Sequence, residues 1–253
     1  MQLRAAPRAS RRALTEIRLF MAPQRTPVVV SFSGIDGAGK STQIELLHSW
    51  LLQSGISVLR LAFWDNVVFL PQFRAGVSHK VLRGELGVGA PGKPVRRKDK
   101  NARKWYLTLA RSPFYFLDVL SLRRVVAKAR MSKADVVIFD RYIYDQLANV
   151  SGNLAGRLYA RLLLALAPRP DIAYLLDADP AAALARKPEY PLEFLREYRQ
   201  AYYRLSKMAR EIVVVSPSDV EHVQQVITRE LRKCLPQLAL DDTQSLENSQ
   251  MTA

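Results

Sequence analysis

Residues 28–42 read VVVSFSGIDGAGKST and decide the fold. Within them, Gly34 to Ser41 match the phosphate-binding pattern G-x-x-x-x-G-K-[ST] at every fixed position. An apolar, β-branched run precedes the pattern, and apolar residues at helical spacing follow it until Gly55. Because the strand, loop and helix patterns agree, the sequence predicts a nucleotide-phosphate site rather than an incidental glycine-rich turn.

The spacing of this loop has a physical reason. Glycines let the backbone curl so that successive N–H groups point at phosphate oxygens, and the positive end of the following helix faces the same oxygens. Lys40 can reach the β- and γ-phosphates, and the Ser41 hydroxyl can ligate Mg²⁺. The residues expected to bind ATP are Gly34, Gly37, Ala38, Gly39, Lys40, Ser41 and Thr42.

Length and composition predict a globular α/β protein. The 253 residues can form one domain with insertions, and the single cysteine, Cys234, excludes an internal disulfide. This cysteine usage fits a reducing cytoplasm, which is where we expect the protein to work. The most apolar helical stretch, residues 158–167, is too short to span a bilayer, so we expect no membrane partner.

The net charge of +15 is concentrated in two segments. Residues 1–25 hold six arginines against one glutamate, and residues 74–104 hold ten basic side chains against two acidic ones. We interpret residues 74–104 as a solvated loop insertion, with a positive wall that steers anionic nucleotides as the alternative. No RNA-binding motif accompanies the charge, so we do not expect a nucleic-acid partner.

The order of the predicted elements gives the domain organisation. After the first strand, strands are expected at 57–64, 135–139, 172–176 and 212–215, with helices between them. Ser112 and Pro113 are expected to begin a new helix that runs to about Ala129, and one helical segment is expected to follow Tyr142 up to Ala167. This alternation predicts a three-layer fold with a five-stranded parallel sheet flanked by helices.

The boundaries around this domain follow from composition. Residues 1–26 are expected to be a basic disordered arm, 27–236 the domain that carries the phosphate loop, and 237–253 a disordered tail. The domain would carry the 74–104 insertion and a short lid at about 184–196. A dispensable leader is favoured for the arm, and a transit peptide or a translation start at Met21 are the alternatives.

Asp140-Arg141-Tyr142 follows the strand expected at 135–139. A carboxylate at the carboxyl end of a buried strand can hold the Mg²⁺ shared with Ser41. Arg141 offers a two-pronged guanidinium suited to phosphate. The plainer alternative is a salt bridge at the end of the strand.

Together these motifs resemble the thymidylate kinase family of P-loop nucleoside-monophosphate kinases over residues 27–235. The resemblance rests on GIDGAGKST, on FDRY at 139–142, and on DADP at 177–180 with the arginine-bearing lid after it. It implies transfer of the γ-phosphoryl group of Mg-ATP to the 5′-phosphate of a (deoxy)nucleoside monophosphate, with dTMP as the first guess. Members of the family form homodimers, so the resemblance implies a homodimer for this chain.

The resemblance also assigns catalytic roles. Asp36 matches the loop carboxylate that contacts the sugar hydroxyl of the acceptor, and Arg141 matches the arginine that holds the acceptor phosphate. Arg186 falls where one branch of the family has a lid arginine, the branch whose phosphate loop lacks a basic residue. With these, the residues expected to be catalytic are Lys40, Asp36, Arg141 and Arg186.

The expected pocket for the acceptor base departs from the family pattern. Members carry Phe-x-x-x-Arg on the helix before the third strand, whereas this chain has Phe114 and then Asp118. An ionised carboxylate cannot donate to a carbonyl oxygen, so Asp118 would suit an amino or ring N–H donor. A register shifted by one turn would face Asp118 elsewhere. The residues expected to bind the acceptor are Asp36, Phe114, Asp118, Arg141 and Gln146, the last able to pair with a pyrimidine edge.

Two other functions stay open at this point. The chain could be a kinase of another nucleotide or of a deoxynucleoside, which would keep phosphoryl transfer but shift specificity. It could also be a non-catalytic ATP-binding protein that holds an acidic partner with its basic insertion. Turnover separates the two classes.

Overall fold

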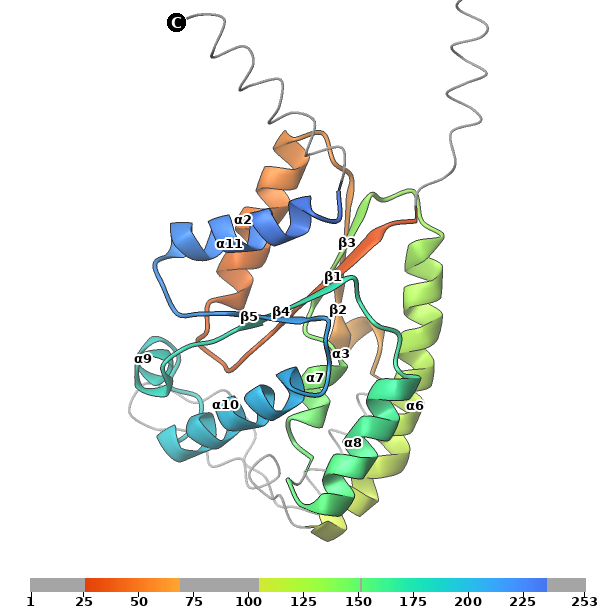
Figure 1. The fold of residues 1–253 in the computed structure, drawn as a ribbon, viewed down its shortest axis with the longest axis vertical. Helices are drawn as coiled ribbons and strands as arrows, with labels where there is room; N and C mark the ends of the chain where they lie inside the picture. The colour runs from red at the N-terminus through yellow and green to blue at the C-terminus, as the bar shows by residue number, and fades with distance from the viewer. Residues whose placement is uncertain (1–25, 69–104, 151, 236–253) are drawn as a thin grey trace, which may run out of the picture.

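The computed structural model describes residues 26–68, 105–150 and 152–235, shown in colour in Figure 1. The predicted basic arm up to residue 25, the insertion at 74–104 and the tail at 237–253 lie outside the described residues. Within the described residues, no helix is both long and apolar enough to cross a bilayer.

The predicted parallel sheet of five strands is confirmed. Its strands pair in the order β2-β3-β1-β4-β5, and every pairing is parallel. The strand bounds are β1 Val28–Ser33, β2 Val58–Ala62, β3 Val136–Asp140, β4 Ile172–Leu176 and β5 Ile212–Val215. Since β1 is central, its carboxyl end lies between those of β3 and β4, where open parallel sheets place ligands.

Helices cover both faces of the sheet (Figure 1). In Figure 1, α2 and α11 lie on one side of the strands, and α6, α7, α8 and α10 lie on the other. The helix bounds are α2 Lys40–Gln53, α3 Phe63–Asn66, α6 Trp105–Arg130, α7 Ile143–Leu147, α8 Leu154–Leu166, α9 Pro180–Arg186, α10 Leu192–Ser206 and α11 Val220–Arg232.

Alternation along β1 divides the core into two halves. Val30 and Phe32 pack with the buried residues of α2 and α11. Val29, on the opposite face, packs with those of α6, α7, α8 and α10. Successive side chains of a strand point to opposite faces, so one buried apolar strand serves both layers.

Three element boundaries differ from the sequence prediction. The second strand ends at Ala62 instead of Trp64, because the chain turns into α3 and the Asn66 side chain accepts from the Ala62 N–H at 2.7 Å. The break expected at Ser112–Pro113 is absent, because α6 continues through Pro113. The single helical segment expected up to Ala167 is two helices, because Asn153 caps a new one by accepting from Gly156 N–H at 2.8 Å.

Candidate active site

The phosphate loop joins β1 to α2 at the central edge of the sheet, and two of its glycines are sterically required. Gly34 and Gly37 have φ angles of 144° and 85°, which L side chains rarely adopt. A Cβ at Gly34 would lie 2.4 Å from the carbonyl oxygen of Leu176, and one at Gly37 would lie 2.4 Å from that of Ala183. The backbone of α9 therefore lies directly against the tip of the loop.

Lys40 begins α2 and is folded back onto the loop. Its ammonium group donates to the carbonyl oxygens of Gly34 and Ile35, each at 2.9 Å, and lies 3.9 Å from a carboxylate oxygen of Asp36. Burial, together with the nearby charge of Arg141, lowers the pKa of Lys40 to about 8. A phosphate at this loop would offer the ammonium stronger, charged acceptors than these two carbonyls.

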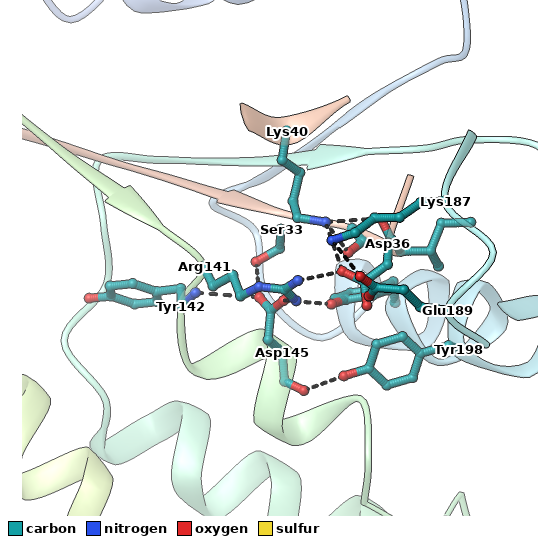
Figure 2. A network of polar contacts seen from close by, with 12 residues as sticks. Ser33, Asp36, Lys40, Arg141, Tyr142, Asp145, Lys187, Glu189 and Tyr198 are labelled. Carbon is teal, nitrogen blue, oxygen red and sulfur yellow. Dashed lines mark hydrogen bonds and ion pairs between the residues drawn. The ribbon is translucent and has the colours of Figure 1, made fainter. Parts of the chain in front are cut away.

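Arg141 directly follows β3 and forms ion pairs with two carboxylates. Its guanidinium donates to Asp36 Oδ1 at 2.5 Å and to Asp145 Oδ1 at 2.9 Å (Figure 2). Burial opposes its charge, but these two carboxylates raise the pKa of Arg141 above its ordinary value. Its φ of 68° lies in the left-handed region, and its N–H donates to Phe32 of β1 at 3.0 Å. The backbone and both carboxylates thus fix the direction of the guanidinium.

Asp145 is the part of this cluster that sequence reasoning missed. It is fully buried, and its carboxylate accepts from the Ser33 hydroxyl at 2.6 Å and from the Tyr202 hydroxyl at 2.8 Å as well as from Arg141. Asp145 stands four residues after Arg141, a spacing at which side chains meet in helical turns. That spacing was the available signal, but the Ser33 and Tyr202 contacts depend on the fold.

Ser41 and Asp140 fit a magnesium site shared with phosphate. Ser41 is exposed in the first turn of α2, and Asp140 ends β3 in register with Phe32 of β1. The negative charge of Asp140 partly opposes the lowering of the Lys40 pKa, so Asp140 is close enough to the loop to act on its lysine. Among the described residues, no cluster of three or more His, Cys, Asp or Glu side chains could hold a metal. This set suits Mg²⁺, which binds few protein oxygens and completes its shell with phosphates and water.

The structure brings two of the expected acceptor-binding residues together. Asp118 of α6 and Gln146 of α7 are both buried, and the Gln146 amide donates to Asp118 Oδ2 at 2.6 Å. Phe114 lies one turn before Asp118 on α6 and is half-buried. Asp118 therefore contacts α7.

The expected lid spans the end of α9, a short linker and the start of α10. Arg186, the last residue of α9, is exposed. Lys187 follows it, forms an ion pair with Glu189 at 3.2 Å, and points toward Lys40 and Asp36 in Figure 2. From the sequence, Lys187 falls within the expected lid at about 184–196 and has no assigned role. The basic side chain of Lys187 next to Arg186 could have marked it as a second candidate for the lid charge. The direction in which it points could not be predicted, because it depends on the contact between α9 and the phosphate loop.

Comparisons with known proteins point to one family. A family model described as thymidylate kinase matches residues 103–227. A probable thymidylate kinase of Pyrobaculum aerophilum is 34% identical over 190 residues, which cover 72% of this chain and 83% of the relative. A probable thymidylate kinase of Methanosphaera stadtmanae is 28% identical over 200 residues, which cover 78% of this chain and 92% of the relative. The crystal structure of thymidylate kinase from Ehrlichia chaffeensis matches with a TM-score of 0.54 at 20% identity, covering 82% of this chain and 99% of that one, and shows the same fold.

Proposed function

The chain belongs to the thymidylate kinase family, and from that premise we propose that it phosphorylates dTMP at the expense of ATP. The family and the P-loop fold make it an ATP-dependent nucleoside-monophosphate kinase. The observation that carries the proposal is Arg141, a guanidinium held between Asp36 and Asp145 beside a complete phosphate loop.

The loop residues and Lys40 bind the phosphates of ATP in this proposal. The Lys40 ammonium leaves the carbonyl oxygens of Gly34 and Ile35 and donates to phosphate oxygens. Ser41 and Asp140 would hold Mg²⁺, which when bound neutralises phosphate charge. The chain's own contribution is to position the phosphates and to stabilise the negative charge that develops on them.

Arg141 and Asp36 orient the acceptor. The acceptor phosphate binds the guanidinium, which Asp145 keeps in place, and Asp36 turns to accept a hydrogen bond from the sugar hydroxyl. An oxygen of that phosphate attacks the γ-phosphorus, the bond to the β-phosphate oxygen breaks, and ADP leaves. No general base is needed, because the acceptor phosphate is already ionised and nucleophilic.

The lid supplies the remaining positive charge. No basic residue stands between Gly34 and Gly39, so the transferring phosphoryl group needs a cation from another element. Arg186 and Lys187, at the end of α9, are the two candidates, and the contact between Gly37 and Ala183 holds that helix over the loop.

Release of ADP from Mg-ATP, measured against a panel of nucleoside monophosphates and deoxynucleosides, tests the proposal. We expect turnover with dTMP and none with deoxynucleosides, and we expect Lys40→Ala to abolish it while the protein stays folded. Undiminished activity of Lys40→Ala would contradict the phosphate-loop assignment. ATP binding without turnover on any acceptor would favour an interaction protein instead.

We also propose a domain organisation, a location and an assembly for this enzyme. Residues 27–236 form the kinase domain and the segments outside it are dispensable for catalysis. The lone cysteine favours the cytoplasm, and the family favours a homodimer. Fluorescent tagging in cells and sedimentation equilibrium of the purified chain would test location and assembly.

A further inference from the structure

The DADP stretch at 177–180 joins β4 to α9 and contains two aspartates with different tasks. Asp179 caps α9, because its side chain accepts from the Ala182 N–H at 2.9 Å. Asp177 instead binds α10. The Nε and Nη2 groups of Arg199 each donate to one oxygen of the Asp177 carboxylate, both at 2.6 Å.

This two-pronged ion pair closes the lid segment, residues 178–198, at its base. The lid segment contains α9, the linker with Lys187 and the first half of α10, so both of its ends meet at the ion pair. Within it, α9 and α10 pack against each other (Figure 1). Two parallel hydrogen bonds fix the angle between the paired groups as well as their distance. The start of α9 is therefore held at a set angle to α10.

Tyr203, one turn after Arg199 on α10, completes what we call the lid clamp: Asp177, Arg199 and Tyr203. The Tyr203 hydroxyl donates to Asp177 Oδ2 at 2.7 Å, and the Arg199 guanidinium carbon lies 5.6 Å from the centre of the Tyr203 ring. Although burial opposes the charge of Asp177, hydrogen bonds from Arg199 and Tyr203 lower the pKa of its carboxyl group. The carboxylate therefore stays ionised at neutral pH, where the ion pair keeps both prongs.

The lid clamp lies against the start of the phosphate loop. The carbonyl oxygen of Leu176, the residue before Asp177, is the atom that a Cβ at Gly34 would meet at 2.4 Å. Gly34 and the three lid-clamp residues also line one small cavity. The position of the lid segment is thus set with respect to the loop that binds the phosphates.

A separate set of contacts ties α10 to the acceptor residues. The hydroxyls of Tyr198 and Tyr202 donate to Asp145, at 2.6 Å to its carbonyl oxygen and at 2.8 Å to its carboxylate. These contacts do not involve the lid clamp. Loss of the clamp should therefore leave the acceptor-phosphate residues in place.

We propose that Arg199 is a positioning residue that, through Asp177, holds the lid at the angle at which its cation reaches the transferring phosphoryl group. This inference rests on the proposed kinase function and deepens it by naming what places the lid charge. A misplacement of about 1 Å can cost about 100-fold in rate. Loss of the clamp is therefore expected to lower kcat and to leave acceptor binding unchanged.

The test measures kcat of the full chain with Mg-ATP and dTMP, together with calorimetric binding of dTMP. We expect Arg199→Met to lower kcat at least about tenfold and to keep the Kd of dTMP within about twofold of the wild type. Arg199→Lys keeps the charge but not the two-pronged geometry, so its kcat should lie in between. This milder variant also serves where Arg199→Met does not fold.

Arg196→Met is the matched control. Arg196 lies on the same helix, is exposed and forms an ion pair with Glu193, so the variant removes one arginine of α10 and leaves the lid clamp intact. Its kcat should equal that of the wild type. An equal loss of kcat in Arg196→Met and Arg199→Met would overturn the inference, because the charge of α10 rather than the clamp would then matter.

A double-mutant cycle separates positioning from stability. In a chain that carries both Arg186→Met and Lys187→Met, the lid has no cation to place. Adding Arg199→Met to this chain should therefore lower kcat by less than about twofold. A merely structural role would lower kcat by the same factor in both backgrounds and would overturn the inference.

Hydrogen–deuterium exchange of the nucleotide-free chain tests the lid clamp without catalysis. Arg199→Met should speed exchange of the α9 amides at least about tenfold relative to those of β1, and Arg196→Met should not. An active wild-type enzyme whose kcat and α9 exchange are unchanged by Arg199→Met would overturn the inference and keep the kinase function. A wild type that turns over no acceptor, with faster α9 exchange in Arg199→Met, would overturn the kinase function and support the clamp.

Discussion

At the scale of single residues, Arg141 depends on Asp145 for its direction and on neighbouring elements for its place. Asp145 accepts from Ser33 of β1, Arg141 and Tyr202 of α10, so one buried carboxylate joins three parts of the fold at the site. A charge buried this deeply persists only where it is paired and hydrogen-bonded. In the proposed function, the cluster therefore serves both stability and the positioning of the acceptor phosphate.

We expect Asp145→Asn to weaken acceptor use more than ATP use. The amide keeps part of the hydrogen bonding but loses the charge opposite Arg141, so kcat/KM for the acceptor should fall about 100-fold, an amount comparable to the loss of one oriented donor. The free energy of unfolding should fall by about 3 kcal/mol, because one partner of a buried ion pair is removed.

Steady-state kinetics with each substrate varied, together with urea unfolding, check this prediction. Tyr202→Phe is its control, since it removes one hydrogen bond to Asp145 and keeps the charge. An equal rise in KM for ATP and for the acceptor would show that Asp145 does not act through Arg141.

Arg186 and Lys187 offer a second residue-scale test. Both side chains are exposed, but Lys187 points toward Lys40 and Asp36, so we expect Lys187→Met to lower kcat by about 100-fold and Arg186→Met by less. Single-turnover measurements at saturating ATP read this step. A larger loss in Arg186→Met would assign the lid charge to the arginine, as the family resemblance implies.

At this scale the sequence predicts residues whose chemistry is local. The loop from Gly34 to Ser41 and the pair Asp140-Arg141 could be read from spacing and neighbouring strands. Asp145 and Lys187 could not be assigned, because their roles come from contacts between segments far apart in the chain. Sequence patterns report on residues that are neighbours in the chain, whereas the partners of Asp145 and Lys187 are neighbours only in the folded structure.

At the scale of elements, α9 packs so closely on the phosphate loop that a side chain at Gly37 would collide with the backbone of α9. Gly37 and Gly39 have nearly the same φ, 85° and 87°, but only Gly37 faces another backbone, at Ala183. We expect Gly39→Ala to cost about 1 kcal/mol from its φ alone. Gly37→Ala should cost about 3 kcal/mol, because the added Cβ also displaces α9.

Urea unfolding of both variants checks the difference, since backbone strain at the shared φ cancels between them. Equal losses would mean that α9 moves aside freely. The circular-dichroism spectra of the two variants before unfolding serve as the control, because they must match that of the wild type for the free energies to be comparable.

Element boundaries were harder to predict than element types. The break between α7 and α8 depends on the Asn153 cap, and the uninterrupted α6 depends on tertiary packing around Pro113. The Tyr159 hydroxyl of α8 donates to the carbonyl oxygen of Ser112, next to that proline. Propensity alone favoured a helix start at Ser112, and tertiary contacts overrode it.

At the scale of the whole molecule, the order of strands and helices was enough to predict the architecture. Five short apolar strands alternating with helices leave few topologies other than a parallel sheet covered on both faces. The strand order itself was not predicted, because β1 pairs with β3 and β4 rather than with β2. That order places the loop between two strand ends, Asp140 on one side and Asp177 on the other.

A truncated chain beginning at Met21 tests the domain proposal. The sheet, the phosphate loop and the candidate catalytic residues all lie between residues 26 and 235, so the first 20 residues supply none of them. We expect kcat/KM for both substrates to stay within about twofold of the full chain at physiological ionic strength, where charges more than about 8 Å apart are largely screened from one another. The melting temperature should change by less than about 2 °C, because no described packing contact is removed.

Repeating the kinetics at low salt is the control: a loss of kcat/KM that appears only there would show that the arginines of the arm steer nucleotides without contributing to the site. A loss that persists at physiological ionic strength would place part of the active site within the first 20 residues and refute the proposed boundary.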